Sequence, residues 1–469
     1  MSAAPPAAPA DGRPHSARPQ RDDARALALR VLQRVEESGA YADLALHAAL
    51  ARSQLDARDR AFATELVYGT LRWRGRLDFL LAQVTGRPLA RLEHHIVQVL
   101  RLGAYQLVFC DRVPDAAAVS ESVRLAHDAG AGRAAGLVNA ALRRLARERN
   151  AIALPTLAED PVAHLMHALS FPRWIAERWI AAFGAQEAAA LADASNATPP
   201  RTLRANRRRI GRDALLAELR ERFPLASACR FAPDGVTLGR RGDPADDPAF
   251  QEGRMTVQDE ASQLVVELLD PQPGERVLDA CAAPGAKATA IAERVGDAGQ
   301  VVALDRNERR LGLVARDAAR LGLDNLRVLR ADASAAEIEG LDGARIDRIL
   351  VDAPCSGLGA LRRNPDARWR VQPDAIAQLA AVQGAILGAV AKRLRPGGTL
   401  VYSTCTLCPE ENDDVVNGLL ASVPELRRAS AATIPPSLRA LVGPDAVLRC
   451  WPQHHDTDGF FAARIERSS

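Results

Sequence analysis

The sequence predicts an α/β protein in which a doubly wound parallel sheet is preceded by an all-helical domain and a small α+β subdomain. From about residue 255, short apolar runs alternate with helix-like segments, as in a parallel sheet with helices on both faces. From about residue 22 to residue 150, apolar residues recur at helical spacing. Between about residues 160 and 250 the two patterns mix.

The composition is typical of a folded protein with several domains. The chain has 469 residues, of which 48% are hydrophobic and 25% charged, and one domain usually takes about 100 to 200 residues. No uninterrupted apolar run approaches the ~18 residues of a membrane span. The seven cysteines are an odd number, and no apolar leader stands at the N-terminus. We therefore expect a soluble, cytoplasmic protein with no membrane partner.

Changes in composition and in the spacing of apolar residues predict four regions. Residues 1–20 are rich in alanine and proline, and we expect a disordered tail. Residues 21–150 are predicted to form the all-helical domain, residues 151–250 linker helices and the small α+β subdomain, and residues 251–469 the sheet domain.

The small subdomain contains a cluster of arginines. Within it we expect a strand at 202–204, a helix at 212–222 and a hairpin around 233–235. Residues 201–222 hold eight arginines and three acidic residues. Because the whole chain has a net charge of only +3, a role with nucleic acid must be argued from such clusters. The cluster is either a solvated surface or a phosphate-binding face.

Five short apolar runs predict the strands of the sheet domain. They are residues 276–280, 301–305, 326–329, 348–352 and 398–402. A ligand site is predicted where the first strand passes through small residues into a helix at 288–294, since backbone amides can approach a ligand there.

Three aspartates end the first three strands, at Asp279, Asp305 and Asp332. Asp305 lies 26 residues after Asp279, which suits a carboxylate that binds ribose hydroxyls, and Asp332 is a candidate acceptor for an adenine amino group. Simple capping of strand ends is the alternative. A nicotinamide-dependent enzyme would also fit, but the loop lacks the G-x-G-x-x-G pattern.

Lysine is nearly absent from the chain. Of the 61 basic residues only Lys287 and Lys392 are lysines, and the other 59 are arginines. A codon bias toward arginine accounts for this composition. Under such a bias, a position that keeps lysine suggests a place where a compact ammonium is needed and the planar arginine group would not serve. Lys287 follows the small-residue loop and is either such a group or an ordinary surface lysine.

Several motifs follow one another in the sheet domain. They are Val257-Gln-Asp-Glu-Ala-Ser262, Asp279-Ala-Cys-Ala-Ala-Pro-Gly-Ala-Lys287, Asp352-Ala-Pro-Cys-Ser-Gly357, Arg363-Asn-Pro-Asp366, Ser403-Thr-Cys-Thr406, Pro409-Glu-Glu-Asn412 and Asp458-Gly-Phe-Phe461. Their types and order resemble the RNA 5-methylcytosine methyltransferase family, with its Rossmann-like catalytic domain.

The helical region carries a second set of motifs. They are Arg58-Asp-Arg-Ala-Phe62, Leu66-Val-Tyr-Gly-Thr70 and Val138-Asn-Ala-Ala-Leu-Arg143, and they are similar to the NusB antitermination-factor fold. The two modules in one chain resemble the bacterial family members that act on 16S ribosomal RNA. The resemblance implies S-adenosylmethionine as cofactor and RNA, most of all 16S ribosomal RNA, as partner. We expect a monomer and no DNA partner.

The resemblance also implies the residues of the site. The cofactor loop comprises Cys281, Ala282, Ala283, Pro284, Gly285, Ala286 and Lys287. Asp305 is placed on the ribose, Asp332 on the adenine, and Asp352 beside the methyl donor and the base. Ala286 stands where the family usually has a second glycine. It carries strain if this position needs a left-handed backbone, and none if the position needs only a small side chain.

The chemistry of this family requires a cysteine. Carbon 5 of cytosine is a poor nucleophile, so a thiolate must first add to carbon 6; after methyl transfer the carbon-5 proton is removed and the thiolate is eliminated. Asp352 is a candidate to hold a proton at ring nitrogen 3. Cys355 and Cys405 follow the fourth and fifth strands and meet at one base if these strands are neighbours. From the residues alone either is a candidate nucleophile, and the resemblance implies Cys405, with Cys355 in product release.

Lys287 is a candidate to orient Asp352 and to favour a nearby thiolate. Two other functions remain as alternatives, a non-catalytic RNA-binding scaffold and a 5-methylcytosine methyltransferase acting on tRNA or DNA. Cys405 and Cys408 form a C-x-x-C, but no second pair accompanies it, so no metal is expected.

Overall fold

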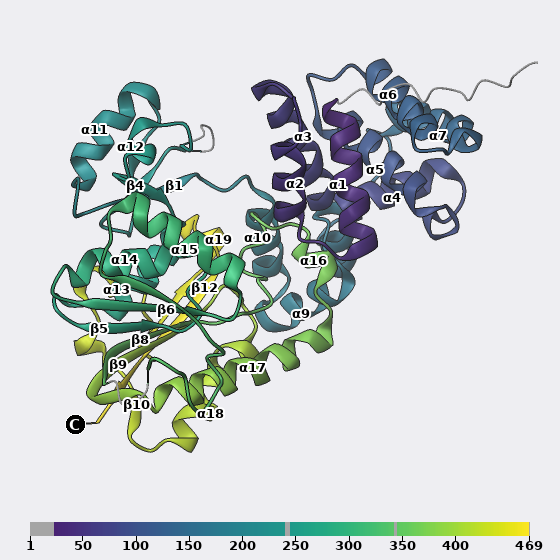
Figure 1. Ribbon diagram of the computed structural model, residues 1–469. Helices are drawn as coiled ribbons and strands as arrows, with labels where there is room; N and C mark the ends of the chain where they lie inside the picture. Colours follow the sequence, from purple (N-terminus) through teal and green to yellow (C-terminus); the bar gives the residue numbers. More distant parts are fainter. Residues whose placement is uncertain (1–22, 240–243, 342–344, 469) are drawn as a thin grey trace, which may run out of the picture. The chain divides into compact units, whose positions relative to one another are not determined.

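The computed structural model of the protein describes residues 23–239, 244–341 and 345–468 (Figure 1). The predicted tail, residues 1–20, lies outside the described residues. The chain divides after Ala153 into two compact units, an N-terminal unit and a C-terminal unit.

The described part of the N-terminal unit contains helices and no strands, as the spacing of its apolar residues predicts. The helices are α1 (Ala24–Ser38), α2 (Ala42–Ala51), α3 (Ala57–Arg72), α4 (Arg74–Thr85), η1 (Leu89–Arg91), α5 (His94–Phe109), α6 (Asp115–Asp128), η2 (Gly132–Ala134) and α7 (Ala135–Glu148). The central helix is α5, which buries 12 of its 16 residues. Gly103 lets α5 pack closely on α7, because a Cβ there would lie 2.5 Å from Leu142 Cδ1.

The C-terminal unit is built around an eight-stranded sheet. Its strands are β5 (Arg276–Asp279), β6 (Gln300–Asp305), β7 (Leu326–Arg330), β8 (Ile346–Asp352), β9 (Leu394–Thr404), β10 (Leu426–Arg428), β11 (Val447–Cys450) and β12 (Phe460–Arg467). Their order is β10-β12-β9-β8-β5-β6-β7, with β11 beside β12. Strands β5 to β9 run parallel, and each contains one of the five predicted apolar runs, apart from the last residue of the first run.

The last three strands depart from the predicted all-parallel sheet. β10 and β11 pair antiparallel with β12, and β12 pairs antiparallel with β9, so that Phe461 lies opposite Thr404. The sheet is therefore mixed. Only the one-turn helix α19 (Pro452–His455) separates β11 from β12. Antiparallel strands need no long crossover helix, so the alternation that indicates parallel strands is missing from this stretch of the sequence.

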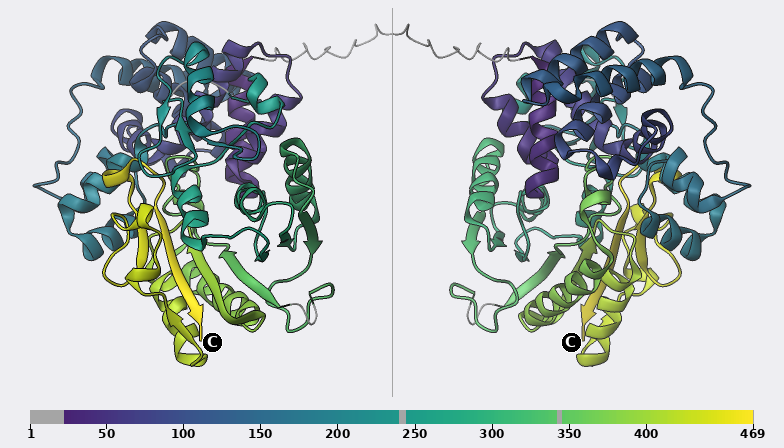
Figure 2. Two further views of the ribbon diagram at one scale, coloured as in Figure 1. Left: turned by 90° about the vertical axis from the view of Figure 1, so that its left-hand side faces the viewer. Right: turned by 90° about the vertical axis from the view of Figure 1, so that its right-hand side faces the viewer.

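Helices cover both faces of the sheet (Figures 1 and 2). α13 (Glu260–Leu269), α14 (Ala286–Val295) and α15 (Glu308–Leu321) pack on one face, and α17 (Pro373–Ala391) and α18 (Asp413–Ser422) pack on the other. Successive strand residues point to opposite faces. Val277 accordingly belongs to the first of these two cores, and Leu278 to the second.

Helix α17 is long and apolar enough, by length and composition alone, to cross a membrane. In the structure Ile386, Leu387 and Val390 on this helix are buried in the core against the sheet. Its side chain Gln383 is also fully buried and donates to other buried groups. The packing therefore accounts for the apolar sequence as that of a helix covering a sheet.

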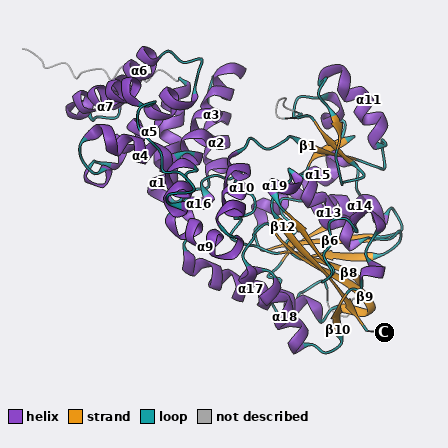
Figure 3. Ribbon diagram, turned by 180° about the vertical axis from the view of Figure 1, so that it is seen from behind, coloured by secondary structure: helices purple, strands orange, loops and turns teal. Residues whose placement is uncertain are grey.

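A second sheet lies apart from the first within the C-terminal unit (Figure 3). It contains β1 (Thr202–Ala205), β2 (Ser227–Ala228), β3 (Gly235–Thr237) and β4 (Met255–Val257), in the antiparallel order β2-β3-β1-β4, with α11 (Arg212–Arg222) and α12 (Pro248–Gln251). The expected strand, basic helix and hairpin are confirmed. This subdomain has its own core, which includes Leu203, Leu219 and Val236.

Eight further helices among the described residues complete the C-terminal unit. They are α8 (Pro161–Ala163), η3 (His164–Ala168), α9 (Arg173–Phe183), α10 (Ala185–Asn196), α16 (Ala367–Arg370), η4 (Pro409–Glu411), η5 (Ala431–Thr433) and η6 (Pro436–Leu438). The buried Arg368 on α16 connects the sheet domain to α10 and to the segment before α9. It donates to Asn196 Oδ1 at 2.8 Å and to the Ser170 carbonyl at 3.1 Å, and lies over the ring of Phe171.

The small subdomain is fastened to α14 by a buried ion pair. Arg204 on β1 and Glu293 on α14 have side chains only 3% and 2% exposed, and Arg204 Nη2 lies 2.7 Å from Glu293 Oε1. Arg204 also donates to the carbonyl of Ala286 at 2.7 Å and to Thr289 Oγ1 at 3.2 Å. Removing one partner of such a pair would leave an uncompensated buried charge, so β1 and the first turn of α14 are held together.

Candidate active site

The carboxyl ends of the parallel strands bring the predicted acidic residues to one edge of the sheet. Asp279 ends β5, Asp305 ends β6 and Asp352 ends β8. These strands are direct neighbours, with β5 between the other two. The edge formed by the carboxyl ends of parallel strands is where such sheets bind ligands.

The loop from Ala280 to Gly285 connects β5 to α14. Gly285 has φ 120°, and a Cβ there would lie 3.1 Å from the Cα of Val314. Both observations require glycine. Ala286 is the first residue of α14 and is not among the described residues with positive φ. Its backbone is therefore unstrained, and the position needs only a small side chain.

Asp305 holds the loop from the side of β6. Its Oδ2 accepts from the Ala283 N–H at 3.3 Å and its Oδ1 accepts from the Asn307 N–H at 2.8 Å. Asp332, just after β7, is exposed, and its Oδ1 accepts from Ser334 N–H at 2.9 Å and Ser334 Oγ at 2.6 Å. These hydrogen bonds from Ser334 lower the pKa of Asp332.

Asp279 is buried at the centre of this edge. It is only 1% exposed, and neither of its carboxylate oxygens accepts a hydrogen bond of ordinary geometry among the described residues, although the backbone N–H of Cys281 is close enough to lower its pKa. Burial and the nearby Asp352 raise the pKa of Asp279 to about 7, against the opposite effect of Lys287. A buried acceptor without a donor is costly, so this carboxyl group is available to a bound ligand.

Lys287 lies inside the site and is not a surface lysine. It is 8% exposed, and its Nζ donates to Asp352 Oδ2 at 2.8 Å and lies 5.1 Å from the centre of the Phe460 ring. Ser403 Oγ donates to the other oxygen of Asp352 at 2.9 Å. Burial lowers the pKa of Lys287, but the Asp352 carboxylate more than offsets this and the net shift is upward. Lys287 is therefore an ammonium ion bound to a fixed carboxylate.

Cys355 and Cys405 lie in contact. β8 and β9 are parallel neighbours with Asp352 opposite Ser403, and each cysteine follows its strand at the same edge. The two Sγ atoms are 3.4 Å apart, and both residues are partly exposed. The expectation that both thiols reach one place is thus met by the geometry.

A buried network of hydrogen bonds holds the residues that flank the two cysteines. Glu411 is fully buried and accepts hydrogen bonds from Ser356 N–H at 2.9 Å, from Ser356 Oγ at 2.5 Å and from Gln383 Nε2 at 3.0 Å. Asn412 accepts from Thr404 Oγ1 at 2.5 Å and donates to the Thr406 carbonyl at 3.1 Å. The residues flanking both cysteines are therefore fixed by the Pro409-Glu-Glu-Asn412 motif.

Comparisons with known proteins agree with this geometry. Residues 266–466 match the model of the 16S rRNA methyltransferase RsmB/F family, residues 22–147 match the NusB family, and residues 171–243 match a ferredoxin-like domain of RsmF/B-like methyltransferases. The ribosomal RNA small subunit methyltransferase B of Pseudomonas putida is 39% identical over 94% of this chain and 98% of its own. The enzyme of that name from Klebsiella pneumoniae is 35% identical over 94% of this chain and 97% of its own.

The chain belongs to the RsmB/F family of 16S rRNA methyltransferases.

Solved structures agree with the RsmB/F assignment. The crystal structure of the protein PH0851 is 25% identical, has a TM-score of 0.77 and covers 95% of this chain and 99% of its own. A methyltransferase homolog protein from Pyrococcus horikoshii is 28% identical, has a TM-score of 0.56 and covers 66% of this chain and 98% of its own.

Two other cysteines of this RsmB/F protein are packed in cores of the C-terminal unit, and Cys281 lies partly buried in the loop before α14. Cys408 is 2% exposed and belongs to the core of α9 and α10, and burial raises its pKa to about 11. Cys450 is fully buried, whereas Cys110 and Cys229 are partly exposed. Among the described residues, no group of three or more His, Cys, Asp or Glu side chains is placed to hold a metal ion.

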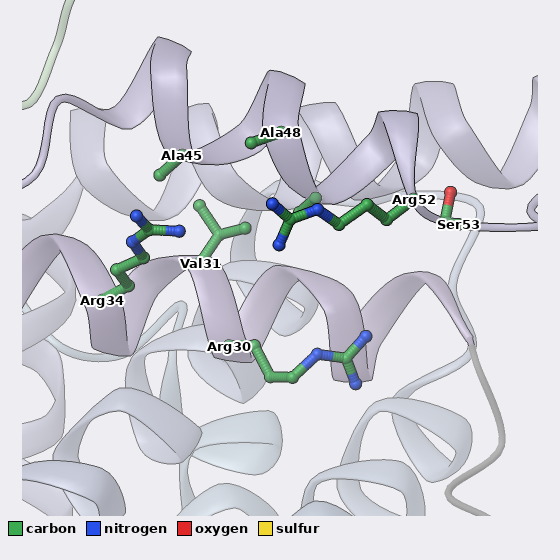
Figure 4. A pocket seen from close by; sticks show the side chains of 8 residues that line it. Arg30, Val31, Arg34, Ala45, Ala48, Arg52 and Ser53 are labelled. Carbon is green, nitrogen blue, oxygen red and sulfur yellow. The ribbon is translucent and has the colours of Figure 1, made fainter.

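Basic side chains line a groove in the N-terminal unit. The groove lies between α1 and α2 and is lined by the exposed Arg30, Arg34 and Arg52, with Val31, Ala45, Ala48, Ala49 and Ser53 (Figure 4). The arginines of the 201–222 cluster have partners within the protein. Arg207 pairs with Asp234, Arg208 with Asp297 and Arg222 with Asp247, while Arg204 is buried.

Sequence reasoning placed Asp279 at this edge without a role, and it missed Ser403 and Glu411 as residues of the site. All three lie in motifs quoted above, but the sequence carried no signal for the hydrogen bonds they make or lack. Ser403 could have been found from the pairing of β8 with β9, since it lies opposite Asp352. Glu411 could not, because its partners come from segments 28 and 55 residues away.

The raised pKa of Asp279 predicts a pH effect on stability. Its pKa is about 7 in the folded protein and about 3.9 in an unfolded chain. The folded state therefore binds the extra proton, and the free energy of unfolding falls as pH rises from about 4 to about 7, by an amount on the order of 4 kcal/mol. Asp279→Asn should remove this loss and unfold at a higher temperature than the unchanged protein at pH 8, but not at pH 4.

The measurement is the thermal unfolding midpoint between pH 4 and pH 8 without cofactor. Asp297→Asn is the control, because Asp297 is 85% exposed and its variant should follow the unchanged protein. If Asp279→Asn keeps the same pH profile as the unchanged protein, Asp279 does not titrate in this range.

Proposed function

We propose that the protein transfers the methyl group of S-adenosylmethionine to carbon 5 of a cytosine in 16S ribosomal RNA, through a covalent cysteine adduct at carbon 6. The observation that carries this proposal is the contact of Cys355 and Cys405, 3.4 Å apart at the ends of adjacent strands. The Lys287–Asp352 ion pair at the same sheet edge supports it. The relatives named for ribosomal RNA methyltransferase activity give the substrate class.

The residues at the edge of the sheet fit S-adenosylmethionine, which supplies an electrophilic methyl group when bound. Asp279 offers two buried oxygens that accept no hydrogen bond of ordinary geometry among the described residues, which suits the hydroxyl or ammonium donors of the cofactor. Gly285 lets the loop pack against α15, since a Cβ there would lie 3.1 Å from the Cα of Val314, and the loop leads directly into the first turn of α14. Asp305 lies at the end of the next strand, beside the loop, as a ribose ligand requires, and Asp332 is assigned to the adenine.

The two thiols and Asp352 have different roles in the reaction of the cytosine ring. The thiolate of Cys405 adds to carbon 6, and the displaced electron pair moves through the ring to nitrogen 3, which takes a proton from solvent and donates it in a hydrogen bond to the Asp352 carboxylate. The resulting enamine carries its nucleophilic centre at carbon 5, which takes the methyl group. Solvent water takes the carbon-5 proton, the electron pair of that C–H bond restores the 5,6 double bond, and the Cys405 thiolate leaves, with the Cys355 thiol donating a hydrogen bond to the departing sulfur. Lys287 fixes Asp352 and favours the ionised form of Cys405 by its positive charge.

The basic groove of the N-terminal unit is the proposed contact to the RNA backbone. Arg30, Arg34 and Arg52 present guanidinium groups around a floor of alanines, which leaves room for a phosphate group. Arginine binds phosphate through its planar fork of donors. The 201–222 cluster is a second candidate, and in it Arg207, Arg208 and Arg209 donate to acceptors within the protein.

The ribose assignment predicts that Asp305→Ala weakens cofactor binding. Loss of hydrogen bonds to a charged carboxylate, about 1.5 to 3 kcal/mol, should raise the dissociation constant of S-adenosylmethionine at least about tenfold. Calorimetry measures this directly, and Asp324→Ala, which removes an exposed carboxylate from the loop before β7, is the matched control. Cofactor affinity equal to that of the unchanged protein in Asp305→Ala would refute the assignment.

The two cysteines should fail differently when each is replaced. Cys405→Ser leaves a hydroxyl that is hardly ionised at neutral pH, so neither a covalent adduct nor methylated RNA is expected. Cys355→Ser should still attack and methylate but release slowly, and so remain joined to its RNA. A denaturing gel with labelled RNA and cofactor should show a slow band for Cys355→Ser alone. A band for Cys405→Ser alone would reverse the two roles, and full activity of both variants would exclude the covalent mechanism and with it this proposal.

The groove predicts a change in the salt dependence of RNA binding. Replacing Arg30, Arg34 and Arg52 with alanine should weaken binding and flatten the log-log salt slope by about one unit for each lost phosphate contact. The control removes the same charge from Arg87, Arg91 and Arg147, which are exposed in the same unit outside the groove. Equal slopes for the two triple variants would show that the groove makes no specific phosphate contacts.

A further inference from the structure

The two thiols of the site have neighbours of opposite charge. On the side of Cys405, the ammonium of Lys287 lies over Phe460, and the next residue, Phe461, pairs with Thr404 beside the cysteine. On the side of Cys355, the buried carboxylate of Glu411 accepts hydrogen bonds from the N–H and the hydroxyl of the next residue, Ser356. A positive charge favours a thiolate and a negative charge disfavours it.

Adjacent residues of one motif hold the backbones around the two cysteines. Around Cys355, Gln383 donates to the Pro354 carbonyl at 2.9 Å, and the Ser356 N–H donates to Glu411. Around Cys405, Asn412 binds both Thr404 and Thr406. The two sides are joined by the hydroxyl contact of Ser356 with Thr406 at 2.7 Å. We call the hydrogen bonds of Gln383 and Glu411 the clamp of Cys355, and those of Asn412 the clamp of Cys405. Only the clamp of Cys355 contains a charged group.

The charge of Glu411 is held in place by its donors. The residue is 0% exposed, and three hydrogen-bond donors face its two oxygens. Donors of this kind stabilise the ionised carboxylate and keep it at a fixed distance from the thiol. In this setting the pKa of Cys355 is raised well above its usual range by its contact with Cys405, by burial and by Glu411.

We propose that the carboxylate of Glu411 keeps the proton on Cys355, so that Cys355 is the donor in the contact between the two thiols and Cys405 is the thiol that ionises. Glu411 is thus a positioning residue that selects the nucleophile. A neutral thiol at 3.4 Å stabilises the Cys405 thiolate before attack and can stabilise it again as the leaving group. The inference rests on the proposed covalent mechanism, and it concerns which of the two sulfur atoms is charged.

The test compares the pH profiles of thiol alkylation in the full chain. Iodoacetamide reacts with the thiolate, and peptide mass spectrometry reads each cysteine separately. Glu411→Gln removes the charge and can keep the network, because the new amide donates to Ser356 Oγ while that hydroxyl donates to Thr406. In a Cys405→Ser background, this change should speed alkylation of Cys355 at least about tenfold at neutral pH, a shift of about one pH unit.

Glu410→Gln is the matched control. Glu410 is the preceding residue with the same charge, is 43% exposed and pairs with Arg178, so its variant should leave both cysteine profiles unchanged. An unchanged Cys355 profile in a folded Glu411→Gln variant would overturn the proposal. A profile that shifts equally in the Glu410→Gln variant would also overturn it, since the effect would then be one of general charge.

A second variant covers the case in which Glu411→Gln does not fold. Asn412→Asp puts a negative charge on the clamp of Cys405, and in a Cys355→Ser background it should slow alkylation of Cys405 at least about tenfold at neutral pH. An unchanged rate would overturn the proposal. Alkylation needs neither RNA nor cofactor, so a failure of this inference is distinguishable from a failure to find 5-methylcytosine in RNA treated with the enzyme.

Discussion

Parallel pairing of β8 with β9 fixes the relative positions of Asp352, Cys355, Ser403 and Cys405. The register puts Ser403 directly opposite Asp352, so the serine hydroxyl can hold one carboxylate oxygen while Lys287 holds the other. A slip of one residue would turn the Ser403 side chain to the other face of the sheet. It would also move Cys405 relative to Cys355 and separate the two sulfur atoms. The register places the ends of the two strands, and the buried hydrogen bonds of Glu411 and Asn412 then hold the loops that follow the strands.

The sequence predicted the parts of this structure that depend on local patterns. Short apolar runs and small residues indicated strands β5 to β9 and the loop before α14, and the positions of Asp305, Asp352 and Lys287 followed from them. Strands β11 and β12 were missed because no crossover helix separates them, and β10 was missed because its three residues are too few to form an apolar run. Lys287 was left open between surface and site, and its burial beside Asp352 depends on contacts 65 residues apart in the chain.

Arginines illustrate the limit of charge counting in a sequence. The excess at 201–222 suggested a phosphate-binding face, yet Arg204 lies in the interior and Arg222 binds Asp247 at 2.7 Å. Only the fold brings these acidic partners to the arginines, because Glu293 and Asp247 lie outside the segment. Burial of Arg204 makes the small subdomain part of the support of α14. Arg204 thereby also holds the carbonyl of Ala286, the residue next to Lys287.

The scarcity of lysine gives the two remaining amino groups very different chemical environments. Lys392 is exposed at the end of α17, whereas Lys287 is 8% exposed and bound to Asp352. An acylating reagent attacks the neutral amine, and an ammonium ion held by a carboxylate is protected from it. Among the lysine side chains, an acylating label would therefore join the protein at Lys392 and leave Lys287 of the methyltransferase site unmodified.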